Sequence, residues 1–528
     1  APGSGVVSDA SRNPAGLTPE PVWLEKMNAY KQRQTGDHRP HVESWHPHKR
    51  GTRNPTHRPH YRLSPPLVSR RLAELYGLVR YTRDPERLKA NLDGAMIQGV
   101  RLVTEFQPFW QPLVRACPAR LVHISPNADQ VASMFGRDKY MGGMTSPCGS
   151  YIYGVPGGAS RVLRVHTRTN AMDWIGDCYQ GKIKWLRGVE VPPEVMDSPA
   201  YPKGACLCLA SNHASILKID PETNEVYTFG EEVISQAGQT RWYYHGGNLA
   251  ANGFMYCIPA NADRVLKVNP RTDEVELIGP TFPGRQKWFG GIHGSDGRIY
   301  GVPQNANGVL QIDPDTEQVT VLALEDGSPL PEGQWKWHGG LRAGDKLYFF
   351  PNNVDTVLVV DTSSAARVYL TGGPEVLQSG RHRIPQDGRY KYLGGALTLD
   401  GRYVYMFPCD AERVCRIDTR TDELRLVGAP LLDGENKYQN GFCGPDGCLY
   451  GIPQRAVGIL RIVPPGVEGI AEDGEEHVDI MYCGDGMVGT KDKFEGGAMG
   501  LDGCVYCIPL RCSEVVKILP GPSVVSAG

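Results

Sequence analysis

Residues 287–322 read KWFGGIHGSDGRIYGVPQNANGVLQIDPDTEQVTVL, and this stretch contains every part of a unit that recurs along the chain. The unit opens with a Lys-aromatic-x-Gly-Gly segment, here Lys287 to Gly291. After an Asp-Gly turn comes a Tyr-x-x-Pro strand, here Tyr300 to Pro303, followed by the alternating stretch VLQIDP. A Thr-x-x-Val turn and strand close the unit. Tight turns between short alternating stretches are typical of antiparallel strands, so each unit predicts a four-stranded sheet.

The unit recurs with a mean spacing of about 50 residues, which lies within the range of propeller blades. The opening segment occurs eight times, as Lys139-Tyr140, Lys184-Trp185, Tyr243-Tyr244, Lys287-Trp288, Lys336-Trp337, Lys391-Tyr392, Lys437-Tyr438 and Lys493-Phe494. A four-stranded sheet cannot bury both faces alone, whereas radial packing of such sheets hides both and leaves only short edges. We therefore predict an all-β, eight-bladed β-propeller. Seven blades are the alternative if the irregular second unit, with Leu207 and Ala210 in place of Tyr and Pro, is not a blade.

The closure of the ring can also be predicted. The last unit ends after residues 515–518, one strand short of the others. A matching pattern precedes the first unit, around 131–135 within 121–136. We predict that an N-terminal strand from this stretch completes the last blade. The repeated aromatic residues and tyrosines are expected to wedge between blades, and the paired glycines to allow close backbone contact near the axis.

Before the propeller, residues 1–63 are rich in Pro, Arg and His and lack periodicity, so we predict an extended arm. From Lys31 to Arg62 the charge is about +6, while the whole chain carries −2, so the arm is expected to meet an anionic partner. The predicted partner-binding residues are Arg39, His41, Trp45, His46, Lys49, Arg50, Arg53, Arg58, His60 and Arg62. His46 and His48 could ligate a metal, but no Cys partner or rigid element accompanies them, so no metal is predicted.

We predict that residues 64–117 form a helical linker and that residues 118–528 form the propeller. Helices are expected over 66–82 and 85–106, with Asp84-Pro85 as their boundary. No run approaches the ~20 apolar residues of a membrane-spanning helix.

The fourteen cysteines show no regular pairing. Cys504 and Cys507 have CxxC spacing, but in a predicted strand this offset directs them to opposite faces. Free thiols in a reducing compartment are therefore expected. The chain begins at Ala1 without an initiator Met, so either a targeting segment has been removed or the sequence starts late, and processing for import into an organelle is the expectation.

The sequence does not predict a catalytic site, a cofactor or a small-molecule substrate. The position before the paired glycines, expected to line the channel, is occupied by Met141, Leu186, His245, Phe289, His338, Leu393, Gln439 and Glu495. With one carboxylate, one amide and two histidines among apolar residues, these positions offer too few ligands to hold a cation. Asn261, Asn305 and Asn352 follow the Tyr-x-x-Pro strands and are expected to cap turns. His293 occurs in only one of the repeated units, so it does not indicate a functional site. The sequence lacks HExxH, Gly-x-Ser-x-Gly and phosphate-loop motifs.

The combination KWxGG, DGxIYGxP and VLxIDP resembles repeat propellers common in algae and other protists, over about residues 118–520. With a basic arm in front, the chain resembles lineage-specific accessory subunits of protist mitochondrial assemblies. The resemblance implies a non-catalytic scaffold subunit in the mitochondrion that contacts neighbouring subunits. The mitochondrial ribosome is favoured because a basic extended arm suits rRNA phosphates. The insertions 191–204 and 465–477 are further candidate contacts.

Three other functions stay open. The chain could be an accessory subunit of a respiratory or photosynthetic membrane complex. It could be a stand-alone adaptor that presents propeller loops to protein partners. It could also be a lactonase-like or esterase-like hydrolase with a metal in its channel.

Overall fold

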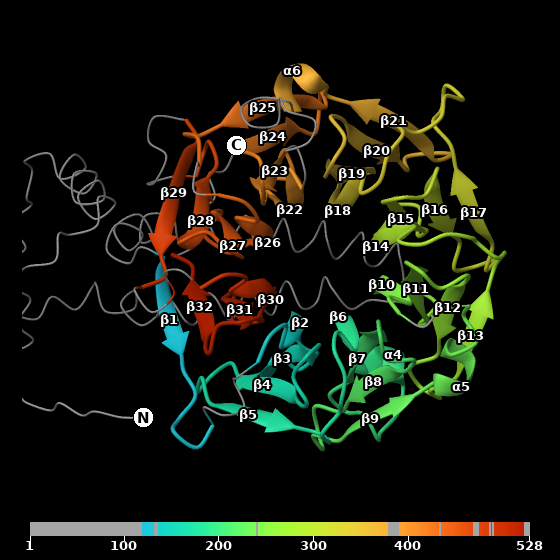
Figure 1. The fold of residues 1–528 in the computed structure, drawn as a ribbon, viewed down its shortest axis with the longest axis vertical. Helices are drawn as coiled ribbons and strands as arrows, with labels where there is room; N and C mark the ends of the chain where they lie inside the picture. The colour runs from blue at the N-terminus through green and yellow to red at the C-terminus, as the bar shows by residue number, and fades with distance from the viewer. Residues whose placement is uncertain are drawn as a thin grey trace, which may run out of the picture. The chain divides into compact units, whose positions relative to one another are not determined.

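The computed structural model describes residues 119–130, 136–238, 241–377, 390–431, 434–467, 475–484, 487 and 490–521. These residues form eight four-stranded antiparallel sheets, arranged as the blades of a closed β-propeller (Figure 1). The innermost strands contact one another in a ring that returns from the last blade to the first. The prediction of eight blades is confirmed, and the irregular second unit is a complete blade. The predicted arm (1–63) and helical linker (64–117) lie outside the described residues.

In blades 1–7 the strands follow sequence order from the axis outward. Blades 1 and 2 contain β2 (Tyr140–Thr145), β3 (Tyr151–Pro156), β4 (Val162–His166), β5 (Met172–Ile175), β6 (Trp185–Val191), β7 (Ala205–Ala210), β8 (Ile216–Ile219) and β9 (Val226–Phe229). Blades 3 and 4 contain β10 (Tyr244–Leu249), β11 (Met255–Pro259), β12 (Val265–Val268), β13 (Val275–Ile278), β14 (Trp288–His293), β15 (Ile299–Pro303), β16 (Val309–Ile312) and β17 (Val319–Leu322).

Blades 5 and 6 contain β18 (Trp337–Ala343), β19 (Lys346–Pro351), β20 (Val357–Asp361), β21 (Arg367–Thr371), β22 (Tyr392–Leu397), β23 (Tyr403–Pro408), β24 (Val414–Asp418) and β25 (Glu423–Val427). Blades 7 and 8 contain β26 (Tyr438–Cys443), β27 (Leu449–Pro453), β28 (Gly458–Val463), β29 (His477–Tyr482), β30 (Phe494–Met499), β31 (Val505–Pro509), β32 (Val515–Leu519) and β1 (Arg120–Ile124). The described helices are single turns, α4 (Pro193–Met196), α5 (Glu231–Ile234) and α6 (Pro374–Leu377). None of them is long and apolar enough to cross a membrane.

The ring is closed by β1, which pairs antiparallel with β32 from Arg120↔Leu519 to Ile124↔Val515 (Figure 1). Closure by an N-terminal strand is therefore confirmed. The predicted position around 131–135 is wrong, because the closing strand spans Arg120–Ile124, at the start of the predicted window 121–136. Residues 131–135 themselves lie outside the described residues. Alternate side chains of β1 reach different cores: Val122 and Ile124 pack with blade 1, and Leu121 packs with the core between blades 7 and 8.

The repeated aromatic residues lie between blades, as predicted, and the three tryptophans among them also donate hydrogen bonds. Trp185, Trp288 and Trp337 are buried. Their Nε1 atoms donate to the carbonyl oxygens of Ser215 (2.8 Å), Gly308 (2.9 Å) and Thr356 (2.7 Å). Each tryptophan therefore fills a core while its polar atom is satisfied inside its own blade.

The paired glycines have two different roles, both visible in blade 4. Gly290 has φ +87°, a left-handed conformation that glycine adopts at little cost. It lies in the irregular register between Trp288 and Gly291. A Cβ on Gly291 would lie 2.9 Å from Cδ1 of Ile258 in the preceding blade. The second glycine is therefore required by close packing between blades.

The repeated lysine, to which sequence reasoning gave no role, connects neighbouring blades. Lys287 Nζ donates to the carbonyl oxygens of Ala260 (3.1 Å), Ala262 (2.8 Å) and Gly284 (3.3 Å), and the first two belong to the preceding blade. Burial lowers the pKa of Lys287 to about 8. The buried lysines of the repeat are Lys139, Lys184, Lys287, Lys336, Lys391, Lys437 and Lys493.

Replacement of Lys287 by methionine is expected to lower the free energy of unfolding by about 1–3 kcal/mol, because buried carbonyl groups lose their donor. Equilibrium denaturation measures this change. The exposed Lys182, replaced in the same way, is the control and should change stability by less than about 0.5 kcal/mol. Equal effects of the two substitutions would contradict the bridging role.

The thirteen cysteines of the described region are all free thiols. Cys507 is buried and Cys504 is partly exposed. Burial raises the pKa of the Cys504 thiol to about 12, so this thiol stays protonated at neutral pH.

Candidate functional site

The predicted channel residues lie on the innermost strands, where side chains from different blades meet. The ring of His245 (β10) stacks on Phe289 (β14), with centroids 4.0 Å apart. His338 (β18) meets both rings edge-on, at 5.8 and 5.9 Å. Across blades 7 and 8, Gln439 Nε2 donates to Glu495 Oε1 at 3.0 Å. The channel thus has an aromatic side and a polar side.

A ring of left-handed residues surrounds one mouth of this channel. The residue before each inner-strand Lys (Tyr243 in blade 3) has a positive φ in every blade, at Asp138, Ile183, Trp242, Gln286, Trp335, Tyr390, Asn436 and Asp492. This conformation is costly for side chains such as Ile, Trp and Tyr. The surrounding structure must therefore hold it in place.

Asparagine side chains hold this ring by joining consecutive blades. Asn261 Oδ1 accepts a hydrogen bond from the backbone N–H of Gln286 at 2.7 Å, and its Nδ2 donates to Arg241 O at 2.8 Å. The same acceptor position is taken by Asn212, Asn305, Asn353 and Asp410, bound to the N–H groups of Trp242, Trp335, Tyr390 and Asn436.

This geometry corrects the prediction of local turn caps at Asn261, Asn305 and Asn352. The first two bind the left-handed residue of the next blade. In blade 5 the equivalent residue is Asn353, whose Oδ1 accepts from Tyr390 N at 3.1 Å. Asn352 is one position away, and its buried side-chain amide has no hydrogen-bond partner in the described part of the chain.

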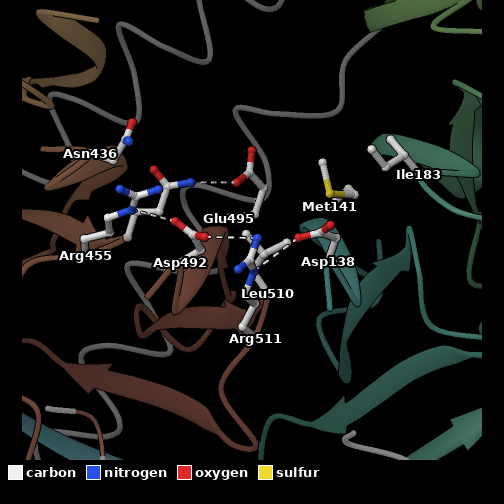
Figure 2. A pocket seen from close by; sticks show the side chains of 10 residues that line it. Asp138, Met141, Ile183, Asn436, Arg455, Asp492, Glu495, Leu510 and Arg511 are labelled. Carbon is white, nitrogen blue, oxygen red and sulfur yellow. Dashed lines mark hydrogen bonds and ion pairs between the residues drawn. The ribbon is translucent and has the colours of Figure 1, made fainter. Parts of the chain in front are cut away.

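The asparagine or aspartate acceptor is missing from blade 1, which has Gly158 at this position, and from blades 7 and 8, which have arginine. Arg455 Nε donates to Asp492 Oδ1 at 2.8 Å. Arg511 Nη2 pairs with Asp492 Oδ2 at 3.1 Å, and its Nε lies 3.4 Å from Asp138 Oδ1. Figure 2 shows the resulting row of alternating charges, Arg455–Asp492–Arg511–Asp138. We refer to these four residues as the ion-pair row.

A cavity of about 280 Å³ lies beside the ion-pair row (Figure 2). Its other lining residues are Met141, Ile183, Asn436, Gln454, Glu495 and Leu510. Glu495 is 9% exposed, and its carboxylate accepts from Gln439 Nε2 at 3.0 Å and Gln454 Nε2 at 3.3 Å. Burial raises the pKa of Glu495.

Arg187 is the other charged residue of the channel that departs from the repeat. It occupies the first-glycine position of blade 2 and retains the left-handed backbone, with φ +65°. Its side chain lies across blade 1, because a Cβ on Gly142 would be 3.6 Å from Arg187 Cδ. Burial and the neighbouring charge of Arg187 lower the pKa of His338 to about 4. Arg187 makes no hydrogen bond or ion pair with any residue that the structure describes.

The structure shows where several residues that the sequence analysis discussed as candidate sites lie. The predicted arm residues, from Arg39 to Arg62, lie outside the described residues, so their contacts stay a prediction. Within the insertion 191–204, Val195 and Met196 are buried against blades 2 and 3. His293 is partly buried, and desolvation is the main cause that lowers its pKa to about 4. Among the described residues no group of three or more His, Cys, Asp or Glu side chains is placed to hold a metal.

Fold and channel together define the chain as an eight-bladed β-propeller with a polar channel mouth. No protein-family model and no curated protein sequence matches it. Among solved structures it is similar to a streptogramin B lyase (12% identity over 76% of this chain and 97% of that chain, TM-score 0.44). It is also similar to Saccharomyces cerevisiae Sqt1 (11% identity, 73% and 97%, TM-score 0.49) and to the RRP9 WD40 repeats (12% identity, 64% and 93%, TM-score 0.44). At these identities the likeness concerns the fold alone.

Proposed function

We propose that the chain is a non-catalytic scaffold subunit of a large organellar assembly, with the mitochondrial ribosome as the assembly. In this proposal the basic arm binds rRNA or a neighbouring subunit. The observation that carries it is the separation of roles along the chain. The repeated Lys, aromatic and Gly residues serve to join the blades, whereas the positive charge of about +6 is concentrated before the propeller.

The construction of the ring supports a scaffold role. Neighbouring blades are joined by buried lysines, by asparagine side chains and by the ion-pair row. The chain enters the ring through β1 at the outer edge of blade 8. The segment that precedes β1 is therefore attached to the ring at the outer edge of blade 8.

Fractionation of organelle lysate tests the assembly. We expect the chain to co-migrate with ribosomal proteins and to be released by RNase. Co-migration with a respiratory or photosynthetic membrane complex would contradict the ribosomal assignment and leave the scaffold role. A monomer near 58.0 kDa as the main species would contradict both.

We expect weaker RNA binding, with a weaker salt dependence, when four arginines of the arm are replaced by Gln. These are Arg50, Arg53, Arg58 and Arg62. For single-stranded RNA the slope of log K against log salt should fall by about 3, because each phosphate contact contributes about 0.7. The measurement is RNA binding by the full chain over a salt series. The matched control replaces four exposed propeller residues, Lys182, Arg241, Arg285 and Arg420. Equal loss in the control would show that the arm is not the RNA-binding element.

A further inference from the structure

Basic side chains occupy one repeated position at the channel mouth. The residue immediately before each left-handed residue is basic and exposed in five consecutive blades, 8 and 1 to 4. We refer to these residues as the basic rim: Lys491, Arg137, Lys182, Arg241 and Arg285. At the same position blade 5 has Gln334 and blade 7 has Glu435, whereas Arg389 of blade 6 lies outside the described residues.

Asparagine side chains hold neighbouring rim residues close together. Asn212 Nδ2 donates to Lys182 O at 3.0 Å, and Asn212 Oδ1 accepts from the N–H of Trp242 at 3.0 Å. Trp242 directly follows Arg241, so one amide group separates the loops that carry two rim residues. Asn261 joins the loops of blades 3 and 4 in the same way.

The rim loops of blades 8, 1 and 2 meet at the cavity of about 280 Å³. Asp492, Asp138 and Ile183 each directly follow a rim residue, and all three line this cavity. Arg511 connects the first two, since it pairs with both carboxylates. The basic rim is therefore one continuous arc along the mouth, from blade 8 to blade 4.

A closed ring of backbone hydrogen bonds holds the strands that carry this arc. In blade 4, Lys287 N donates to Ala260 O of the preceding blade at 3.0 Å, and Gln304 N donates to Lys287 O at 2.9 Å. Both bonds recur in every blade, and the ring closes where Lys139 N donates to Leu510 O at 3.0 Å. Each rim residue lies two positions before a member of this ring. The backbone of the basic rim is therefore organised before a partner binds, which lowers the entropic cost of binding.

The charges of the basic rim are not neutralised within the described part of the chain. None of the five side chains forms an ion pair or a hydrogen bond with a residue that the structure describes. The carboxylates that lie closest in the sequence, Asp138 and Asp492, are bound by the arginines of the ion-pair row. On the body of blade 4, by contrast, Arg298 pairs with Asp313 at 3.0 Å. Cations gathered at one mouth without counter-charges attract an anionic partner.

Apolar side chains at the mouth indicate which kind of anionic partner fits. Four of them are partly exposed: Ile183, Trp242, Trp335 and Tyr390. Arginine together with tryptophan and tyrosine is the composition of binding hot spots between proteins. A nucleic acid would need free aromatic faces for stacking, but Trp335 already packs edge-on with Phe289 and Tyr390, at 5.8 and 6.3 Å. A phosphate backbone that followed the mouth would also meet the exposed carboxylate of Glu435.

We propose that the basic rim docks an acidic segment of a partner protein. The Asp and Glu carboxylates of this segment bind the rim cations, and the guanidinium groups of Arg137, Arg241 and Arg285 suit such two-oxygen anions. Apolar residues of the same segment contact the partly exposed side chains at the mouth. The inference rests on the proposed scaffold role, but it does not involve residues 1–63. The propeller and the arm then bind chemically different partners.

Binding of a fluorescent peptide to the full chain tests the proposal. The probe is a short peptide rich in Glu with a single Trp, and the control probe has Gln in place of every Glu. We expect the Glu peptide to bind with an affinity that falls as salt is added, and the Gln peptide to bind at least about tenfold more weakly. Equal binding of the two peptides would overturn the proposal.

Matched variants assign the binding to the rim. Replacement of Lys182, Arg241 and Arg285 by Gln should weaken binding of the Glu peptide by about tenfold or more. Tm should not fall, because these side chains have no partner in the described chain. The control replaces three exposed arginines on or beside outermost strands and should bind like the wild type: Arg168, Arg420 and Arg425. Wild-type affinity in the rim variant, or equal loss in the control, would refute the site.

The same variants separate this inference from the proposed function. The rim variant should bind single-stranded RNA like the wild type, and the variant of the four arm arginines should retain peptide binding. If the rim variant loses RNA binding as strongly as peptide binding, the occupant of the rim is a nucleic acid and the proposal is wrong. Peptide binding through the rim without RNA binding by the arm would support this inference and contradict the ribosomal assignment.

Discussion

A chain that begins at Pro126, and therefore lacks β1, is expected to lose roughly 4–8 kcal/mol of its free energy of unfolding. The estimate comes from Ile124, which is buried, and from Leu121 and Val122, which are partly buried and contribute less than the about 1.5–3 kcal/mol of a fully buried apolar side chain. These side chains pack on the cores that flank blade 8 on both sides. Their removal also leaves β32 as the unpaired outer edge of blade 8.

Chemical denaturation and sedimentation measure the two consequences, lower stability and association through the exposed edge. The control is a chain that begins at Ala119, which retains β1 and differs from the shorter chain only by residues 119–125, and it should unfold at a higher denaturant concentration than the shorter chain. If the shorter chain does not fold, Val122→Asp in the full chain tests the same contact and should lower the unfolding midpoint. Equal stability of the chains beginning at Ala119 and Pro126 would show that β1 does not close the ring.

The fold could be predicted because its determinants are local and repeated. Each Lys-aromatic-x-Gly-Gly segment encodes a bulged inner strand, and eight copies predict eight blades. The closing strand was harder to locate. A five-residue rim strand such as β1 carries little pattern of its own, and its position is set by pairing with β32, nearly 400 residues away.

The channel mouth was predicted only in part. The lining residues, such as His245 and Glu495, follow from the register of the inner strand. Arg187 and Arg511 were missed because their environment comes from other blades, as when Arg511 meets Asp138 across the closure of the ring. Their signature in the sequence is a departure from the repeat, with arginine where other blades have glycine or asparagine. The confusion of Asn352 with Asn353 has a related cause, since only the backbone register distinguishes two adjacent asparagines.

The second large effect is expected for Trp288→Ala, which should lower the free energy of unfolding by about 3–5 kcal/mol. Trp288 is 2% exposed and packs in one core with Ile258 of blade 3 and Leu310 of its own blade. The ring of Phe282 meets it edge-on, with centroids 5.0 Å apart. Alanine at this position leaves a cavity between two blades, and the closed ring limits how far they can collapse into it.

Trp288→Phe is the matched variant, because blade 8 has Phe494 at the equivalent position of the repeat, buried in its own core. It retains most of the packing but removes the Nε1 donor that Gly308 O accepts at 2.9 Å. A loss of about 1–2 kcal/mol is expected, mainly from the unsatisfied carbonyl group. Equilibrium denaturation of both variants separates packing from hydrogen bonding. If phenylalanine costs as much as alanine, the hydrogen bond to Gly308 and not the volume of the ring holds blade 4 in place.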